Sequence, residues 1–154
     1  MPLSRLLPAI IATLTAAVPA QADPGHAHFS AGQPGDPKKP ARVVEILMKE
    51  GNGTMSYLPD RVEVKRGEQV RFVLKNVGAL AHEFVLASTA DNLKHAALMQ
   101  KYPDMEHDDP NGKTVQPKGS SEILWRFTRR GEFEFGCLIP GHREAGMLGK
   151  VFVK

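Results

Sequence analysis

The sequence predicts an all-β domain, an antiparallel Greek-key β-sandwich of seven to eight short strands with one short helix and one irregular excursion. Three observations support this fold class. Apolar side chains recur with a period of two over short runs, turn sequences separate these runs, and one segment carries helix-capping residues. Short strands joined by turns are typical of sandwiches, and 154 residues suffice for one domain with a core.

The first expected strands follow one another before residue 76. The run 42–48 is rich in Val and Ile, and residues 61–65 alternate charged and apolar side chains. In the run 70–75, three apolar side chains share one face. Turn sequences lie at residues 51–53, 66–68 and 76–78.

Four further rows of side chains share strand faces in the second half of the chain. They are His82, Phe84 and Leu86; Ile123, Trp125 and Phe127; Phe133, Phe135 and Cys137; and Val151 and Val153. Two of these rows carry a possible metal ligand at one end, His82 in the first and Cys137 in the third. We therefore expect both side chains at one pole of a packed core.

One segment departs from strand periodicity. Ser88 or Thr89 provides a helix cap, and the helix is expected to end near Lys101 because Pro103 follows. The residues 103–112 then predict an irregular excursion before the next strand.

The N-terminal segment predicts export. Arg5 precedes the mostly apolar stretch 6–18, and Ala20-Gln21-Ala22 is a small-residue cleavage site, so residues 1–22 are expected to be a signal peptide cleaved near Ala22. A retained membrane anchor is the alternative, although the apolar stretch is short for a bilayer. Export would place the mature protein in the periplasm or an equivalent compartment.

The rest of the chain divides into an arm and a domain. Residues 23–40 are rich in Pro and Gly, contain two His, and predict a flexible arm, whereas residues 41–154 predict one folded domain. The formal net charge is +3, and basic residues do not cluster with aromatic ones, so nucleic acid is not an expected partner. We also expect a monomer without stable membrane insertion.

Cys137 is the only cysteine, and in an exported protein a single cysteine is either a free thiol or a ligand. His142 and Met147 follow it at five-residue steps in a loop with Pro and Gly at its turns. With His82 from a distant strand, these side chains supply the two imidazoles, thiolate and weak axial thioether of a type 1 copper centre. Zinc is the alternative metal, but a thioether favours copper.

The C-x4-H-x4-M loop, the sequence His82-Glu83-Phe84 and the final run 149–153 resemble the cupredoxins, the family of plastocyanin, azurin and pseudoazurin. The similarity covers residues 42–154 and is greatest to the periplasmic copper-tolerance cupredoxins of the CopI type. It implies a cupredoxin-like sandwich around one copper ion. The implied ligands are His82, Cys137, His142 and Met147.

The resemblance also implies details around the ligands. The carbonyl group of Ala81 would approach the metal from the side opposite the thioether. Plastocyanin and azurin usually have Asn after the first His ligand, where it ties the ligand loops together, but this chain has Glu83. The backbone N–H of Glu83 is expected to donate to the thiolate, and its carboxylate is expected to alter the metal's surroundings.

Further thioether and imidazole groups predict a second, softer copper site. It would be transient and exposed, built from some of Met55, Met99, Met105 and His107. The copper-tolerance cupredoxins have a similar Met- and His-containing segment. The alternative is that Met48, Met55 and Met99 pack the lid of the sandwich and His107 faces water.

No nucleophile–base pair or phosphate loop stands out, and four protein ligands leave no open metal position, so we do not expect an enzyme. Two functions remain: copper tolerance through binding, holding or transfer of copper, and electron transfer to a reductase or oxidase. An electron carrier would dock to its partner through an apolar patch round His142, formed by Leu138, Ile139, Pro140 and Ala145. The Met- and His-containing segment favours tolerance.

Overall fold

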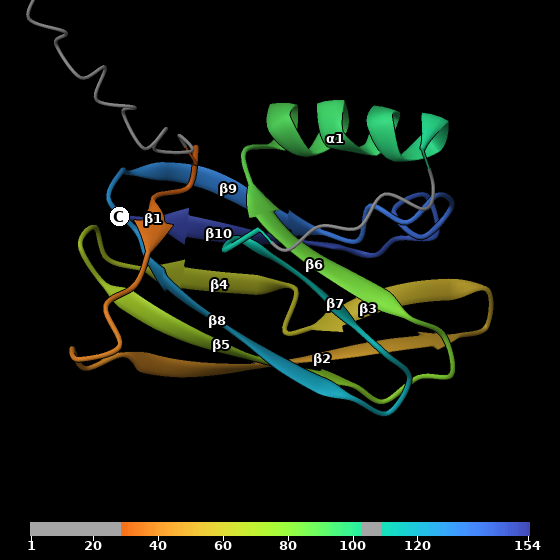
Figure 1. Cartoon of the computed structure of the whole chain (residues 1–154), viewed down its shortest axis with the longest axis horizontal. Coiled ribbons are helices and arrows are strands. Elements are labelled where there is room, and N and C mark those ends of the chain that lie inside the picture. Colours follow the sequence, from red (N-terminus) through yellow and green to blue (C-terminus); the bar gives the residue numbers. More distant parts are fainter. Residues whose placement is uncertain (1–28, 103–108) are drawn as a thin grey trace, which may run out of the picture.

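The computed structural model describes residues 29–102 and 109–154 as a two-layer β-sandwich with one helix (Figure 1). The first sheet contains, in spatial order, β1 (Gln33–Pro34), β8 (Ser120–Arg126), β5 (Gln69–Asn76), β2 (Arg42–Gly51) and β3 (Thr54–Leu58). The second contains β4 (Arg61–Val64), β10 (Leu148–Val153), β9 (Gly131–Gly136), β6 (His82–Ala87) and β7 (Gly112–Val115). The expected signal peptide, residues 1–22, lies outside the described residues.

The sandwich and the short helix expected from the sequence are confirmed. The described residues contain ten strands, because β1, β3 and β7 are short and add to the runs recognised by periodicity. Each sheet also contains one parallel pair, β2 with β5 and β4 with β10, while the other neighbouring strands are antiparallel. Alternation within one strand carries no information on the direction of its neighbour.

Residues 29–40, assigned to a flexible arm by their composition, lie against the sandwich. β1 pairs with β8, and Ala31 is fully buried. The indole Nε1 of Trp125 donates to the Ala31 carbonyl at 3.2 Å, and the ring of Phe29 meets that indole edge-on at 5.3 Å. The folded unit therefore begins before residue 41.

The core between the sheets is built around aromatic side chains. Phe84 from β6 and Phe135 from β9 stack with ring centroids 4.9 Å apart, and Phe72 from β5 lies 5.3 Å from Phe84. All three are fully buried. Each stacked ring stands two residues from a potential ligand, Phe84 from His82 and Phe135 from Cys137, so the core fixes the strands that carry those ligands.

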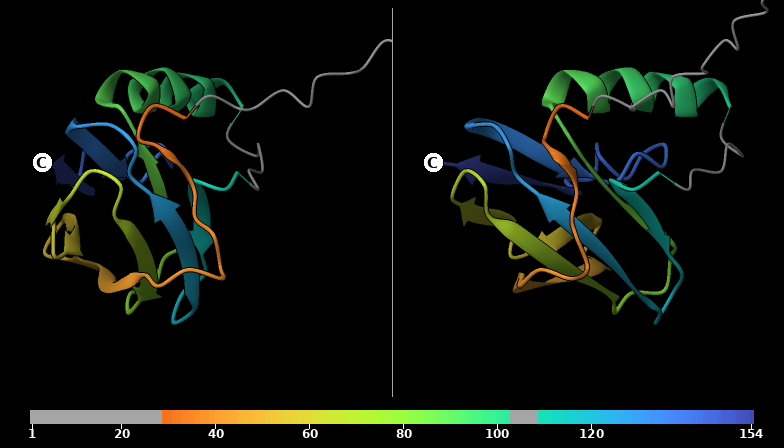
Figure 2. Two further views of the ribbon diagram at one scale, coloured as in Figure 1. Left: turned by 90° about the vertical axis from the view of Figure 1, so that its left-hand side faces the viewer. Right: turned by 60° about the vertical axis from the view of Figure 1, so that its left-hand side comes forward.

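Helix α1 (Thr89–Lys101) lies against β6 and β9, on the side of the second sheet away from β2 and β5 (Figure 2). Ser88 is its N-cap: the hydroxyl accepts the N–H of Asp91 at 3.1 Å, as expected. Among the described residues, no helix is both long and apolar enough to span a membrane.

Replacing Phe84 with Ala is expected to lower the free energy of unfolding of the copper-free protein by about 3–5 kcal/mol, because it leaves a cavity between the sheets. Urea denaturation measures this loss. Leu93→Ala is the control, since that side chain on α1 is 52% exposed and its removal should change stability by less than about 0.5 kcal/mol. Equal effects of the two substitutions would contradict this description of the core.

Candidate metal centre

The strand order brings the predicted ligands to one end of the second sheet. His82 is the first residue of β6, Cys137 follows the last residue of β9, and Met147 precedes the first residue of β10. β9 is antiparallel to both β6 and β10, so the start of each neighbour lies beside its end. His142 lies in the loop between β9 and β10.

Three of the four predicted ligands form a compact cluster. Nδ1 of His142 lies 3.3 Å from Sγ of Cys137 and 3.3 Å from Nδ1 of His82. The donor atoms of all three residues lie within 4.8 Å of one another. His82 and Cys137 are fully buried, whereas His142 is only partly buried.

Backbone hydrogen bonds place Met147 beside this cluster. Its N–H donates to the carbonyl of His142, and its carbonyl accepts the N–H of Cys137, both at 3.1 Å. The side chain is fully buried in the same core cluster as the cysteine. Gly141 (φ 87°) and Gly146 (φ 99°) supply the left-handed backbone that this loop needs at its turns.

The sulfur of Cys137 lies in an apolar surrounding with backbone donors. Burial raises the pKa of the thiol to about 12, although hydrogen bonds from the N–H groups of Glu83 and Ile139 lower it in part. The first of these bonds, expected from the sequence, is 3.3 Å long. A free thiol at this position is protonated at neutral pH.

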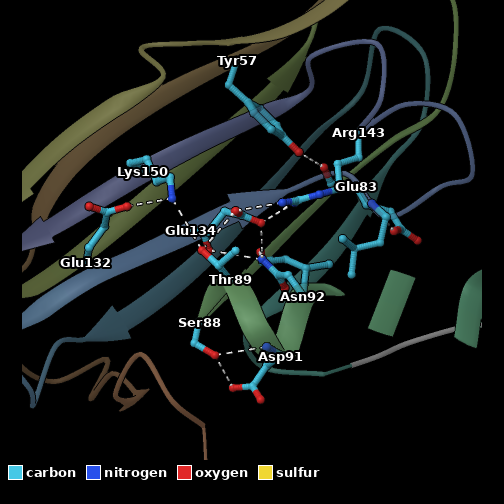
Figure 3. Close-up of polar contacts among 12 residues, drawn as sticks. Tyr57, Glu83, Ser88, Thr89, Asp91, Asn92, Glu132, Glu134, Arg143 and Lys150 are labelled. Carbon is cyan, nitrogen blue, oxygen red and sulfur yellow. Dashed lines mark hydrogen bonds and ion pairs between the residues drawn. The ribbon is translucent and has the colours of Figure 1, made fainter. Parts of the chain in front are cut away.

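Glu83 links β6 to the ligand loop. Its carboxylate Oε2 accepts the N–H of Leu138, the residue after Cys137, at 3.3 Å. Its carbonyl accepts the hydroxyl hydrogen of buried Tyr57 on β3 (Figure 3). The carboxylate therefore ties the first ligand strand to the loop, the role that Asn has in plastocyanin and azurin by resemblance.

A second carboxylate, that of Glu134, holds the other side of the loop (Figure 3). Glu134 is 1% exposed and forms a two-point ion pair with Arg143, the neighbour of His142; the Nη2–Oε2 distance is 3.0 Å. Asn92 on α1 donates to Oε1 of Glu134 at 3.3 Å and to the carbonyl of Val85 at 3.2 Å. One carboxylate thus connects β9, α1 and the ligand loop.

A third carboxylate, that of Glu50 in β2, was not expected from the sequence. Its Oε2 lies 2.8 Å from Nε2 of His82, the ring nitrogen that faces away from the cluster. Hydrogen bonding to His82 and to the N–H of Ala79 lowers the pKa of Glu50 to about 2. The only sequence signal is an acidic residue just before the turn at 51–53, since its partner lies in the other sheet.

The donor set fits copper. Zinc-site bond lengths of about 2.0 Å to nitrogen and about 2.3 Å to sulfur would place trigonal donors about 3.5–3.7 Å apart, so the two 3.3 Å contacts fit a first-row metal ion of this size, zinc as well as copper. Imidazole, thiolate and thioether together suit an ion that alternates between a harder and a softer state. Binding of copper requires the thiol of Cys137 to lose its proton.

The softer second site is not supported by the residues that the structure describes. Met99 is 2% exposed and packs with Val85 and Leu138, and Met55 packs against the main core. These positions agree with the alternative that the two methionines pack against the core, and Met99 is not exposed as the predicted site would need. Met105 and His107 lie outside the described residues.

The expected apolar patch round His142 also changes. Leu138 is 2% exposed because it turns inward beneath α1, so it contributes nothing to the surface. Ile139 and Ala145 are partly exposed, and Pro140 is exposed. These three residues are the apolar ones of the original four that reach solvent.

Glu134→Gln is expected to lower the free energy of unfolding at pH 7 by about 2–3 kcal/mol, because it removes the buried partner of the Arg143 ion pair. The 15% exposure of the Arg143 side chain limits the loss. Burial opposes ionisation of Glu134, but the hydrogen bond and charge of Arg143 lower its pKa below the ordinary 4.5. The stabilisation is therefore complete above pH 4.5 and is lost as the pH falls through the lowered value.

Urea denaturation of the two proteins over a pH series measures this difference, which should shrink below pH 4.5. Glu122→Gln is the control, since that carboxylate pairs with Arg71 on the surface at 2.7 Å. It should change stability by less than about 1 kcal/mol at every pH. A pH-independent effect of Glu134→Gln would contradict the ion pair as its cause.

Comparisons with known proteins agree with a copper-binding protein. The family model described as copper binding proteins, plastocyanin/azurin family, matches residues 44–154. The chain is 48% identical to "Copper-resistant cuproprotein CopI" of Rubrivivax gelatinosus, with 90% of each chain covered. It is 36% identical to the protein of the same name from Pseudomonas aeruginosa, with 97% of each covered.

Among solved structures, reduced auracyanin from the photosynthetic bacterium Roseiflexus castenholzii superposes with a TM-score of 0.61 at 22% identity, covering 75% of this chain and 99% of that one. This likeness supports the fold alone. The family model matches nearly all of the described sandwich, and two relatives align along at least nine-tenths of the chain. The chain therefore belongs to the plastocyanin/azurin family of copper binding proteins, and copper is its metal.

Proposed function

We propose that this protein is an exported copper-tolerance protein that holds or transfers copper in the periplasm. It would do so through one type 1 centre with the ligands His82, Cys137, His142 and Met147. The observation that carries this proposal is the buried cluster of two imidazoles and a thiol, in a chain 48% identical to a protein named copper-resistant. The expected signal peptide, residues 1–22, supports export.

Bound copper supplies exchange of a single electron between its cupric and cuprous states. The chain's own residues keep the donors in place during that exchange. The carboxylates of Glu83 and Glu134 hold the ligand loop from two sides, and the N–H of Glu83 supports the thiolate. A donor set that moves little suits both charge states of the ion.

Four protein donors leave no position for a substrate, and this supports a binding role rather than an enzymatic one. The proposed partners are copper ions and a protein that exchanges copper or electrons with the site. We propose that the protein acts as a monomer.

Binding of one copper ion at pH 7 is expected to release about one proton, because the pKa of the Cys137 thiol is raised to about 12 and the thiol ligates as thiolate. His142 adds little, since burial lowers its pKa and keeps it neutral. Calorimetry of copper binding in buffers of different ionisation enthalpy counts the proton. Cys137→Ser should release none, and equal proton release from both proteins would contradict the assignment of the thiolate.

Deletion of the gene tests the function in cells. Under the proposal the deleted strain is more sensitive to copper, wild-type protein restores growth, and Cys137→Ser protein does not. Purified wild-type protein loaded with Cu(II) should show intense thiolate-to-copper absorption in the visible, which the same substitution removes. Full restoration of growth by the Cys137→Ser protein would show that tolerance does not depend on this centre.

Electron transfer is the second candidate, and the partial exposure of His142 favours it. A ligand imidazole that reaches the surface beside Ile139, Pro140 and Ala145 gives an electron a short path to a docked partner. Under this reading the deletion blocks a respiratory reaction and leaves copper tolerance unchanged.

A further inference from the structure

The carboxylate of Glu50 links the two sheets at the end of the sandwich that carries the proposed ligands. Glu50 lies near the end of β2 in the first sheet, and its Oε2 lies 2.8 Å from Nε2 of His82 at the start of β6 in the second. The histidine is fully buried and the Glu50 side chain is 20% exposed. This contact between the carboxylate and the imidazole is therefore shielded from most of the surrounding water.

The other oxygen of the carboxylate is also occupied. Oε1 of Glu50 accepts the N–H of Leu80 at 3.0 Å and the N–H of Ala79. Both donors belong to the loop that leads into His82. The carboxylate consequently fixes the backbone before the histidine as well as its ring.

Gly78 makes room for this carboxylate. A Cβ atom at position 78 would lie 1.8 Å from Oε2 of Glu50 and 2.5 Å from its carboxyl carbon. Buried Asn76 holds the same loop, accepting the N–H of Gly78 at 2.9 Å and donating to the carbonyl of Leu80 at 2.7 Å. The chain thus provides a shaped backbone site for the side chain of Glu50.

We propose that Glu50 is a positioning residue that selects the tautomer of His82 and favours the cupric state of the bound ion. A carboxylate only accepts hydrogen bonds, so it keeps the ring proton on Nε2. The Nδ1 lone pair is then free on the side of the ring that lies 3.3 Å from Nδ1 of His142. A carboxylate behind a ligating imidazole also raises its basicity, which helps a divalent ion more than a monovalent one.

This inference rests on His82 being a copper ligand, as proposed above. The effect of Glu50 on the His82 ring and on the reduction potential can be measured separately from its effect on the stability of the fold. A purely structural contact would change the free energy of unfolding. It would leave the ring tautomer and the reduction potential of the folded protein unchanged.

Two substitutions disturb the contact in different ways. Glu50→Gln leaves a single oxygen, which can serve either the backbone N–H groups or His82 but not both. Gly78→Ala keeps the charge and displaces the carboxylate through the new Cβ. Glu45→Gln is the matched control, because Glu45 lies on the same strand and pairs with Lys75 at the surface.

The expected result is a loss of about tenfold in Cu(II) affinity for Glu50→Gln with a smaller change for Cu(I). With Cu(I) affinity unchanged, this loss raises the one-electron reduction potential by about 59 mV, and any loss of Cu(I) affinity makes the rise smaller. Gly78→Ala should shift the potential in the same direction, and Glu45→Gln should match wild type. Ring-nitrogen NMR shifts of the copper-free protein should show the Nε2–H tautomer of His82 in wild type and its loss in Glu50→Gln.

Wild-type values of both tautomer and potential in folded Glu50→Gln and Gly78→Ala proteins would overturn the inference. Should Glu50→Gln fail to fold, the Gly78→Ala protein decides alone. Failure of the proposed centre is a different outcome: wild-type protein would then show no thiolate-to-copper absorption with Cu(II). The tautomer measurement in copper-free protein still tests Glu50 in that case.

Discussion

The structure depends on one constraint: the thiol of Cys137 must be buried and must still lie close to ligand atoms from other segments. Cys137 is fully buried just after the end of β9, two residues beyond Phe135, whose ring stacks on that of Phe84. In that position it can meet donors only from neighbouring strand ends or from its own loop. The antiparallel pairing of β9 with β6 and β10 provides both, since it puts His82 at one side and the return of the loop at the other.

Three carboxylates then connect the elements that meet at this pole. Glu83 joins β6 to the loop, Glu134 joins the loop to β9 and α1, and Glu50 joins the two sheets through His82. A carboxylate buried without partners would destabilise the fold. Glu134 is offset by the cation of Arg143, Glu50 by backbone N–H groups and His82, and Glu83 by the N–H of Leu138. The ligand atoms are held by these links in addition to the apolar core.

The ligand residues could be predicted because short stretches of sequence identify them. Cys137, His142 and Met147 share one loop, and His82 ends an apolar row, so spacing and periodicity found them. Glu50 could not be found in the same way, because its partner is 32 residues away in the other sheet.

Composition was misleading for a similar reason. Residues 29–40 look like a linker in sequence, but Ala31 is buried by Trp125 from a distant strand. In α1 the buried positions include Asn92 as well as Met99, while Leu93 is exposed. Asn92 is drawn inside because its amide satisfies the buried carboxylate of Glu134, a need that no pattern of apolar residues reveals.

The imidazoles of His82 and His142 differ in solvent exposure and in how firmly they are held, so the two sides of the site are not equivalent. His82 is sealed from solvent and held from behind by Glu50, whereas His142 is partly exposed on a loop fixed by its neighbour Arg143. Movement of His82 would break a contact between the sheets, but movement of His142 would disturb only the loop. Exchange of an ion or an electron with the outside therefore costs least on the side of His142. The same face would suit either proposed function, so a partner for copper transfer or for electron transfer would contact the surface around the His142 ring.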